Sequence, residues 1–183
     1  DNTVIPAANN FQAQGKVLND LAINFCSSGN KTENYLTRLQ QQWRLTSEAW
    51  YQLLPYKFGP LEASLLFPAY TFIDSYRLRG TDYTETMRNE IDQLLASPEI
   101  LSVEFFSKKT FNKVGLLALE ISLFETATDQ SKETNQIVSE YNSDVRKCQL
   151  LSGYSAELLR RADIIQQGWT NNYRDTGKVI ATY

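Results

Sequence analysis

The stretch that most constrains the fold reads VGLLALEISLF and runs from Val114 to Phe124. It is apolar on almost every side of a helix, and a helix without a polar face lies at the centre of its bundle. Glu120 is the only charged residue in this stretch, so we expect a buried carboxylate. Because a buried charge without a partner costs several kcal/mol, we expect a hydrogen bond or ion pair to Glu120. The candidate partners lie in the Lys57–Glu62 turn or the Tyr76–Arg77 segment.

Helical spacing of apolar residues also marks the segments on both sides. Residues spaced by three, four and seven cover Phe11 to Phe25, Leu36 to Leu53 and Met87 to Leu95. A rhythm of the same kind continues from Ile137 to Trp169, which predicts one long last helix. Glycine and proline are few, with eight and five residues, as expected for long helices joined by short loops. The sequence therefore predicts an all-α protein with an up-down helical bundle fold.

The composition bounds the number of domains. The chain has 183 residues, of which 42% are apolar and 21% are charged, and this balance is typical of one globular domain. We expect the helical-bundle domain to cover residues 1–170. The helical rhythm is lost over residues 171–183, which we expect to form a frayed tail or a linker.

The absence of histidine and the charge balance exclude several classes of function. Without any histidine the chain cannot use a Ser-His-Asp or Cys-His mechanism or a histidine-ligated zinc ion. The net charge is −3, and no basic stripe is present that would bind nucleic acid or a polybasic segment that would bind an anionic membrane. No apolar run approaches the length of roughly 20 residues that spans a bilayer.

The two cysteines, Cys26 and Cys148, are either buried free thiols or one disulfide. We favour the disulfide, because it would close a very long loop and stabilise the fold by about 5 kcal/mol in the chain-entropy model. A disulfide indicates an oxidising compartment such as a periplasm or a cell surface. The sequence starts at Asp1 rather than at methionine, so we expect a processed or trimmed N-terminus, in which a removed export signal would leave no trace.

Two further segments carry candidate binding residues, each with a simpler reading beside it. In Lys57–Glu62 a Gly-Pro turn follows an aromatic residue, and Glu62 would lie in the first turn of a helix. The segment could form part of a binding site, or it could be an ordinary helix connector whose glutamate stabilises the helix dipole. The guanidiniums of Arg77 and Arg79 beside Tyr76 could hold an anion or carboxylate, or could belong to a solvated loop. Glu120 could bind a ligand or metal, or be satisfied by an Arg, Lys or Tyr of another helix.

Taken in order, four parts of the chain resemble the imelysin family. Each part resembles one feature of that family: an aromatic helix followed by an FGP turn, a GxHxxE segment with a trailing LLF, an RxC motif, and a tryptophan that ends the RxC helix. The matching residues are Trp43 to Trp50 with Phe58-Gly59-Pro60, Gly115 to Glu120 with Ile121 to Phe124, Arg146-Lys147-Cys148, and Trp169. Cys26 also falls where the predicted-lipoprotein branch of the family tends to have a partner cysteine.

The resemblance implies a fold and a function, with two departures. Gly115 and Glu120 match the GxHxxE motif, whereas Leu117 replaces its histidine. Branches that lack the histidine are regarded as binding proteins rather than peptidases and are often associated with iron uptake. Family members are also considerably longer and have a second helical bundle that helps to form the functional cleft. The resemblance therefore implies the first bundle of a normally two-bundle fold, with residues 171–183 as a frayed tail or a linker to an absent second half. The chain would then be a fragment, or be completed by a second chain, or be a one-bundle form.

We therefore expect an exported, non-catalytic, imelysin-like binding protein of the periplasm or cell envelope, with a link to iron or metal uptake. The resemblance and the residues together place a ligand site at Phe58, Gly59, Pro60, Glu62, Tyr76, Arg77, Gly115 and Glu120. No cofactor is required, although Glu120 and Glu62 could supply oxygen ligands to a divalent metal or iron. The partner would be a ligand or a cell-envelope protein, with membrane tethering through a removed lipid anchor as a further hypothesis.

Two other functions remain open at this point. The first is a metal-dependent, peptidase-like hydrolase with a degenerate GxHxxE motif, in which Glu120 and Glu62 act as hard oxygen ligands without histidine. The second is a structural bundle that docks onto a membrane-associated partner through the Tyr- and Phe-rich segment from Phe67 to Tyr76.

Overall fold

The computed structural model describes residues 3–62, 67–75 and 80–173, and it contains helices and no strand within these ranges. The α-helices are α1 (Val4–Ser27), α2 (Glu33–Leu53), α3 (Thr84–Ala96), α4 (Val103–Ser107), α5 (Leu116–Phe124), α6 (Thr134–Ser143) and α7 (Val145–Gln167). Short 3₁₀ turns form η1 (Gly59–Glu62), η2 (Ala69–Phe72) and η4 (Phe111–Lys113), and α7 continues into a π-helical turn, η5 (Gly168–Tyr173). The predicted all-α bundle is confirmed.

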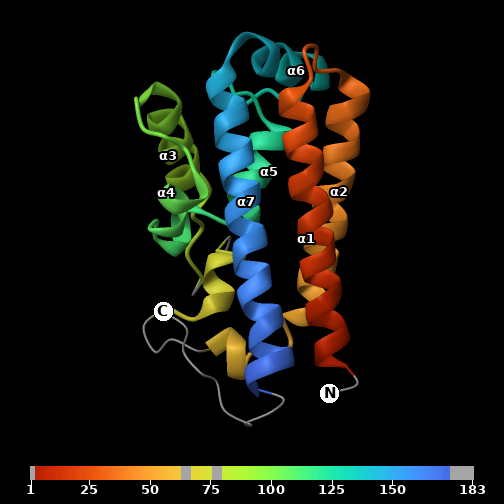
Figure 1. Ribbon diagram of the computed structural model, residues 1–183. Helices are drawn as coiled ribbons and strands as arrows, with labels where there is room; N and C mark the ends of the chain where they lie inside the picture. The colour runs from red at the N-terminus through yellow and green to blue at the C-terminus, as the bar shows by residue number, and fades with distance from the viewer. Residues whose placement is uncertain (1–2, 63–66, 76–79, 174–183) are drawn as a thin grey trace.

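Three long helices form the body of the bundle. In Figure 1, α1 rises from the N-terminus, α2 descends beside it, and α7 descends along its other side. Their apolar faces come from the spacing seen in the sequence, with Phe11, Leu18 and Leu36 completely or almost completely buried. α1 and α7 approach closely where Gly15 faces Ala162, whose Cβ lies 3.9 Å from the position a side chain would take. None of the helices in the described residues is long and apolar enough to cross a membrane.

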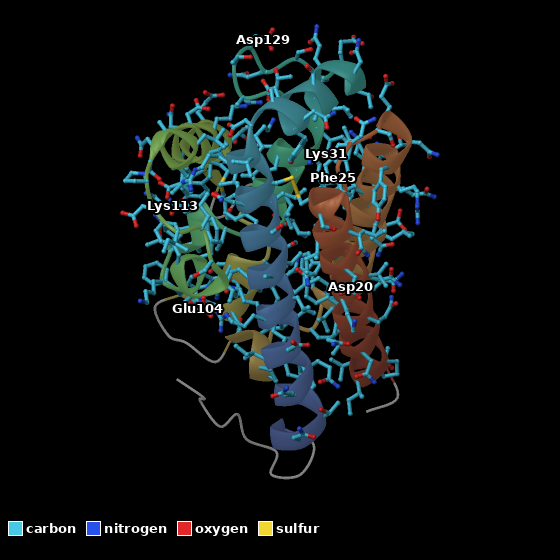
Figure 2. The ribbon with its side chains drawn as sticks, turned by 45° about the horizontal axis from the view of Figure 1, so that its top comes forward. Asp20, Phe25, Lys31, Glu104, Lys113 and Asp129 are labelled. Atoms are coloured by element: carbon cyan, nitrogen blue, oxygen red, sulfur yellow. A yellow bond between two sulfur atoms is a disulfide. The ribbon has the colours of Figure 1, made fainter. Side chains whose placement is uncertain are left out.

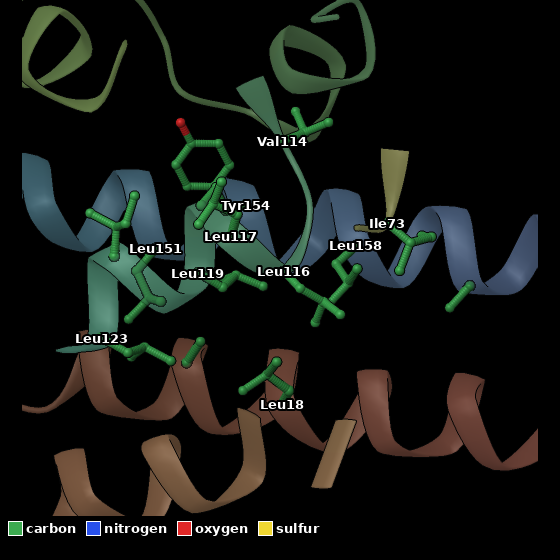
Figure 3. Close-up of a cluster of buried hydrophobic side chains, with 14 of the residues drawn as sticks. Leu18, Ile73, Val114, Leu116, Leu117, Leu119, Leu123, Leu151, Tyr154 and Leu158 are labelled. Carbon is green, nitrogen blue, oxygen red and sulfur yellow. The ribbon is translucent and has the colours of Figure 1, made fainter. Parts of the chain in front are cut away.

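The short helix α5 lies inside the bundle and is tied to α2 at both of its ends. The indole of Trp43 donates to the carbonyl of Leu116 over 3.1 Å, and the amide of Gln40 donates to the carbonyl of Leu123 over 2.8 Å. Figure 3 shows the leucines of α5 among buried side chains of α1 and α7. These contacts fix the rotation of α5 about its own axis, and with it the direction in which Glu120 points.

The helices α3 and α4 form a smaller unit on one side of α7 (Figure 1). Its centre is the buried carboxylate of Glu90, which accepts from Lys109 over 2.8 Å and from Lys113 over 2.6 Å. Burial opposes ionisation of Glu90, but the two ammonium groups outweigh it and lower the pKa of the carboxyl. These ion pairs hold η4 and the segment that leads into α5.

The last helical segment is two helices rather than the one that the sequence predicts. α6 ends at Ser143 and crosses the top of the bundle in Figure 1, and α7 begins at Val145. Asp144 accounts for the break, because its side chain accepts from the backbone N–H of Arg146 over 2.8 Å and so caps a new helix. The apolar rhythm continues across this cap, which is why periodicity alone did not reveal it.

The predicted disulfide between Cys26 and Cys148 is confirmed. It joins the last turn of α1 to the first turn of α7, and the two Cα atoms are 5.3 Å apart. Figure 2 shows the bond between the two helices. The expected consequence for the fold is a covalent tie at one end of the α1–α7 pair.

Candidate functional site

Glu120 is exposed to solvent, which corrects the prediction that it is buried. Every other residue from Leu116 to Leu123 is buried, so α5 has one outward position rather than none. Within the described part of the chain, the carboxylate makes no hydrogen bond or ion pair, so the expected partner in the Lys57–Glu62 turn is not found there. Lys57 instead places its ammonium over the ring of Tyr70, 4.9 Å from the centroid. Tyr76 and Arg77, the other expected partners, lie outside the described residues.

Acidic residues and a tyrosine surround Glu120. Partial burial, and then the nearby carboxylates of Glu125 and Asp74, raise the pKa of Glu120, while Lys132 opposes them. The hydroxyl of Tyr51 donates to Asp74 over 3.1 Å. Burial, the charge of Asp74 and this hydrogen bond raise the pKa of Tyr51 to about 12, with a smaller contribution from Glu120. Glu120 therefore lies near two other carboxylates, of which Asp74 is hydrogen-bonded to Tyr51.

Sequence reasoning did not find these neighbours. Tyr51 is exposed on the polar side of α2, and Asp74 follows the η2 turn, so neither position interrupts a pattern. Glu125 is the first residue after α5, and Arg88 of α3 binds it through two hydrogen bonds of 2.9 and 2.8 Å. Glu125 is five residues after Glu120, outside the spacings of three and four that bring side chains together on a helix, so the sequence carried no signal for this pair.

Gly115 positions the start of α5 against η2. Its φ is +92°, and a Cβ atom there would lie 2.5 Å from the carbonyl oxygen of Ile73 and 2.6 Å from that of Phe72. The next residue, Leu116, donates its backbone N–H to Ile73 over 2.8 Å. Only glycine fits such a conformation and such a contact, so the predicted site residue Gly115 joins the η2 turn to the helix that carries Glu120.

The turn Phe58-Gly59-Pro60 packs on η5, the continuation of α7. The ring of Phe58 meets that of Trp169 edge to face, with the centroids 5.2 Å apart, and Gly59 has a φ of +56°. Pro60 is buried against Gly168, where an added Cβ would lie 2.9 Å from the Cβ of the proline. Glu62 ends the turn and is exposed. This turn and the Gly115 junction are linked through η1 and η2, which pack on each other.

A comparison with models of protein families matches the imelysin peptidase family over residues 4–179. The chain belongs to the imelysin family. The match covers nearly the whole sequence, and it includes the FGP turn, the segment from Gly115 to Glu120 and the disulfide cysteines.

A solved structure agrees with the assignment to the imelysin family at the level of the fold. The crystal structure of an imelysin-like protein from Psychrobacter arcticum 273-4 superimposes with a TM-score of 0.75, at 24% sequence identity and over 95% of this chain. The superposition covers 48% of that protein, so the present chain spans about half of its length. A comparison with curated proteins finds no match.

Within the imelysin family motif that this chain resembles, position 117 is the departure, and its side chain faces inward. Leu117 is 3% exposed and belongs to the buried cluster of Figure 3, together with Val114 and Tyr154. Glu120, one helical turn later, faces outward. The position that holds histidine in the motif is therefore part of the hydrophobic core in this chain.

The described residues do not bring together a complete set of metal ligands. No group of three or more Cys, Asp or Glu side chains among them is arranged to hold an ion. Glu120 and Glu62, the two candidate ligands, are both exposed and lie on different elements, α5 and η1. A metal bound by either carboxylate would need further ligands from water, from its cargo or from another part of the protein.

Proposed function

We propose that this chain is part of a non-catalytic, exported binding protein of the imelysin family. The observation that carries the proposal is the contrast between two positions of the Gly115–Glu120 segment, because Leu117 is buried in the core and Glu120 is exposed. A hydrolase that uses a metal or a general base needs the reacting group within reach of the substrate. A leucine under the surface offers no such group, whereas an exposed carboxylate can still bind.

The ligand that we propose is cationic or carries a metal ion, in line with a role in iron or metal uptake. Glu120 and Asp74 bring negative charge to the outward side of α5. Besides burial, the carboxylates of Glu125 and Asp74 raise the pKa of Glu120, and those of Asp74 and Glu120 raise the pKa of Tyr51. A cation near these groups would relieve that repulsion and bring the pKa of Glu120 down. Carboxylate and phenol oxygens are also the hard ligands that Fe³⁺ and divalent ions such as Ca²⁺ accept.

The proposed location is a periplasm or cell envelope. The support is the disulfide between Cys26 and Cys148, since such bonds persist in oxidising compartments and are rare in the cytosol. The site would be completed by a second helical half, because the imelysin-like structure that superimposes on this chain is about twice as long.

The binding function is tested by metal titration of the purified protein. We expect calorimetric binding of a divalent ion such as Ca²⁺, and we expect Glu120→Gln to weaken it about tenfold or more, since it removes a charged ligand. Glu104→Gln is the matched control, because Glu104 is an exposed glutamate on α4 that should leave the affinity unchanged. Equal binding by the parent and both variants would show that Glu120 has no part in it.

The absence of catalysis is tested separately with peptide substrates and added divalent ions. We expect no hydrolysis, and we expect Leu117→His to lower stability without creating activity, because the new imidazole would be placed in the core. Cleavage that is abolished both by a chelator and by Glu120→Gln would contradict the proposal and favour the hydrolase.

A second candidate, a structural bundle that docks onto an envelope partner, is favoured by one observation. Phe67 is half exposed and lies on the ring of Phe111, with the centroids 5.5 Å apart, and Tyr83 meets the same ring edge to face. Phe67→Ser should then abolish retention of the protein on isolated envelopes while metal binding is unchanged. Retention that is insensitive to this substitution argues against docking through this cluster.

A further inference from the structure

The disulfide joins two helix ends of opposite polarity. Cys26 is the second-last residue of α1, and Cys148 is the fourth residue of α7. The aligned peptide dipoles give a helix a partial negative charge at its C-terminus and a partial positive charge at its N-terminus. A thiolate is therefore disfavoured at Cys26 and favoured at Cys148.

The charged side chains around Cys148 do not reverse the preference for a thiolate at Cys148 over Cys26. Arg146 and Lys147 precede it in the first turn of α7, and Asp144 caps that turn. Lys147 is buried and forms an ion pair with Glu140 of α6. The two cations and the two carboxylates roughly offset one another, so the positive end of α7 remains the main influence on the sulfur of Cys148.

The disulfide is reachable from solvent on one side. An open groove of about 570 Å³ has both cysteines in its wall, and its rim carries Ile100 and Val145, which are 82% and 69% exposed. Cys26 is half-buried, whereas Cys148 is only 6% exposed. Cys26 is thus the more accessible of the two cysteines, and we take it as the one that a thiol entering the groove attacks.

We propose that Cys26–Cys148 is a thiol–disulfide exchange site that reacts in the folded protein, with Cys26 attacked and Cys148 as the leaving thiolate. The thiolate of a reductant forms a bond to Sγ of Cys26 while the Cys26–Cys148 bond breaks, and the electron pair goes to Sγ of Cys148. With a dithiol reductant, the second thiol then displaces Cys26. The protein has gained two electrons and two protons, and the dithiol has become a disulfide.

The fold around the disulfide keeps its packing when the bond opens. Below the bond, α1 and α7 stay together through Ala22, Leu18 and Leu158, all buried, and through the close approach of Gly15 to Ala162. Reduction therefore releases the last turn of α1 from the first turn of α7 and leaves the rest of the bundle folded. The exchange site acts as a local, reversible tie.

The experiment uses the folded, oxidised protein and glutathione, a monothiol, with rapid trapping by iodoacetamide and peptide mass analysis. We expect glutathione on Cys26 and the alkyl group on Cys148, in about tenfold excess over the reverse pattern, because the better leaving thiolate departs. The rate should be independent of low urea concentrations, and the far-UV circular dichroism should stay unchanged. An excess of the adduct on Cys148 would overturn the proposed direction.

Two variants test whether the groove is the route. Ile100→Trp narrows its rim at a highly exposed position and should slow the exchange several-fold without changing stability. Ile164→Trp, at a partly exposed position of α7 outside the residues that line the groove, should leave the rate unchanged. If exchange needs urea in proportion to global unfolding, the disulfide is a purely structural bond and the proposal fails. If Ile100→Trp reacts as fast as the parent, the groove is not the route by which the thiol reaches Cys26.

Discussion

The two ends of the α1–α7 pair are held by different means. At the end near α6, the Cys26–Cys148 bond joins the helices covalently, and polar groups close around it. At the end near the N-terminus, no disulfide is present in the described residues. A glycine contact serves there instead, where Gly168 receives the ring of Pro60, and a second glycine contact lies at the start of α5, where Gly115 receives the η2 turn. The disulfide end can be released by reduction of the bond, whereas the Gly168–Pro60 contact would be disrupted by a single added methyl group.

The largest effect is expected from removal of the covalent tie. Replacement of both Cys26 and Cys148 by alanine should lower the free energy of unfolding by about 5 kcal/mol, because the unfolded chain regains the entropy of a very long loop. Urea unfolding of the oxidised parent and the variant measures the difference, and a reducing agent should bring the parent close to the variant. A loss below about 1 kcal/mol would mean that the unfolded chain keeps its ends together without the bond.

At the start of α5, away from the disulfide, Gly115→Ala should be strongly destabilising. The new Cβ would meet two carbonyl oxygens at 2.5 and 2.6 Å, and φ is +92°, so we expect a loss of roughly 2–4 kcal/mol in unfolding free energy. Gly29→Ala is the control, since nothing lies within 4 Å of the added atom, and it should change stability little. Similar unfolding midpoints for the two variants would show that the η2 contact is dispensable.

A smaller loss is expected for Gly168→Ala. Its Cβ would lie 2.9 Å from the Cβ of Pro60, so the Phe58-Gly59-Pro60 turn must shift. Overpacking of this kind should lower the free energy of unfolding by about 1–3 kcal/mol. The contact between α1 and α7 at Gly15 should respond in the opposite way, because Gly15→Ala is expected to stabilise the protein. Its Cβ meets Ala162 at 3.9 Å, an ordinary contact, and alanine suits a helix interior better by about 0.5–1 kcal/mol. Thermal unfolding should therefore move in opposite directions for the two variants.

The smallest effect concerns the charge of Glu120. Because its pKa is raised in the folded protein, ionisation destabilises the fold as the pH rises from the ordinary glutamate pKa through the raised one. Glu120→Gln should therefore stabilise the protein at neutral pH, by less than about 1 kcal/mol for an exposed group, and should make no difference in acid. Unfolding curves at pH 3 and pH 7 measure this sign. A variant that is less stable at pH 7 would reveal a partner for the carboxylate.

Much of the fold could be predicted from the sequence, because its main cause is periodic burial. The first two helices end where Ser27 is followed by a glycine-containing loop and where Pro55 approaches, and both stops were visible in the residue order. The break at Asp144 was not predicted, because a helix cap is a local hydrogen bond and leaves the apolar spacing intact. Apolar periodicity predicts which side of a helix is buried, but it does not predict where one helix ends and the next begins.

The candidate site was predicted less well, for a reason that Glu120 illustrates. A nine-residue helix rich in leucine is compatible with burial on all sides or with one outward position. Trp43 and Gln40 decide between the two, since their hydrogen bonds to the ends of α5 set its rotation. Contacts of this kind join residues far apart in the chain, and a single sequence contains no signal for them. The neighbours Tyr51 and Asp74 were missed for the same reason.

The junction at Gly115 also has an evolutionary consequence. The carbonyl oxygens of Phe72 and Ile73 occupy the space that any side chain at position 115 would need, so the η2 turn and the start of α5 must change together or not at all. Among related chains, we expect a residue other than glycine at this position only where the η2 segment has been lengthened, shortened or rebuilt. An alignment that shows the two segments varying independently would mean that the contact is peculiar to this chain.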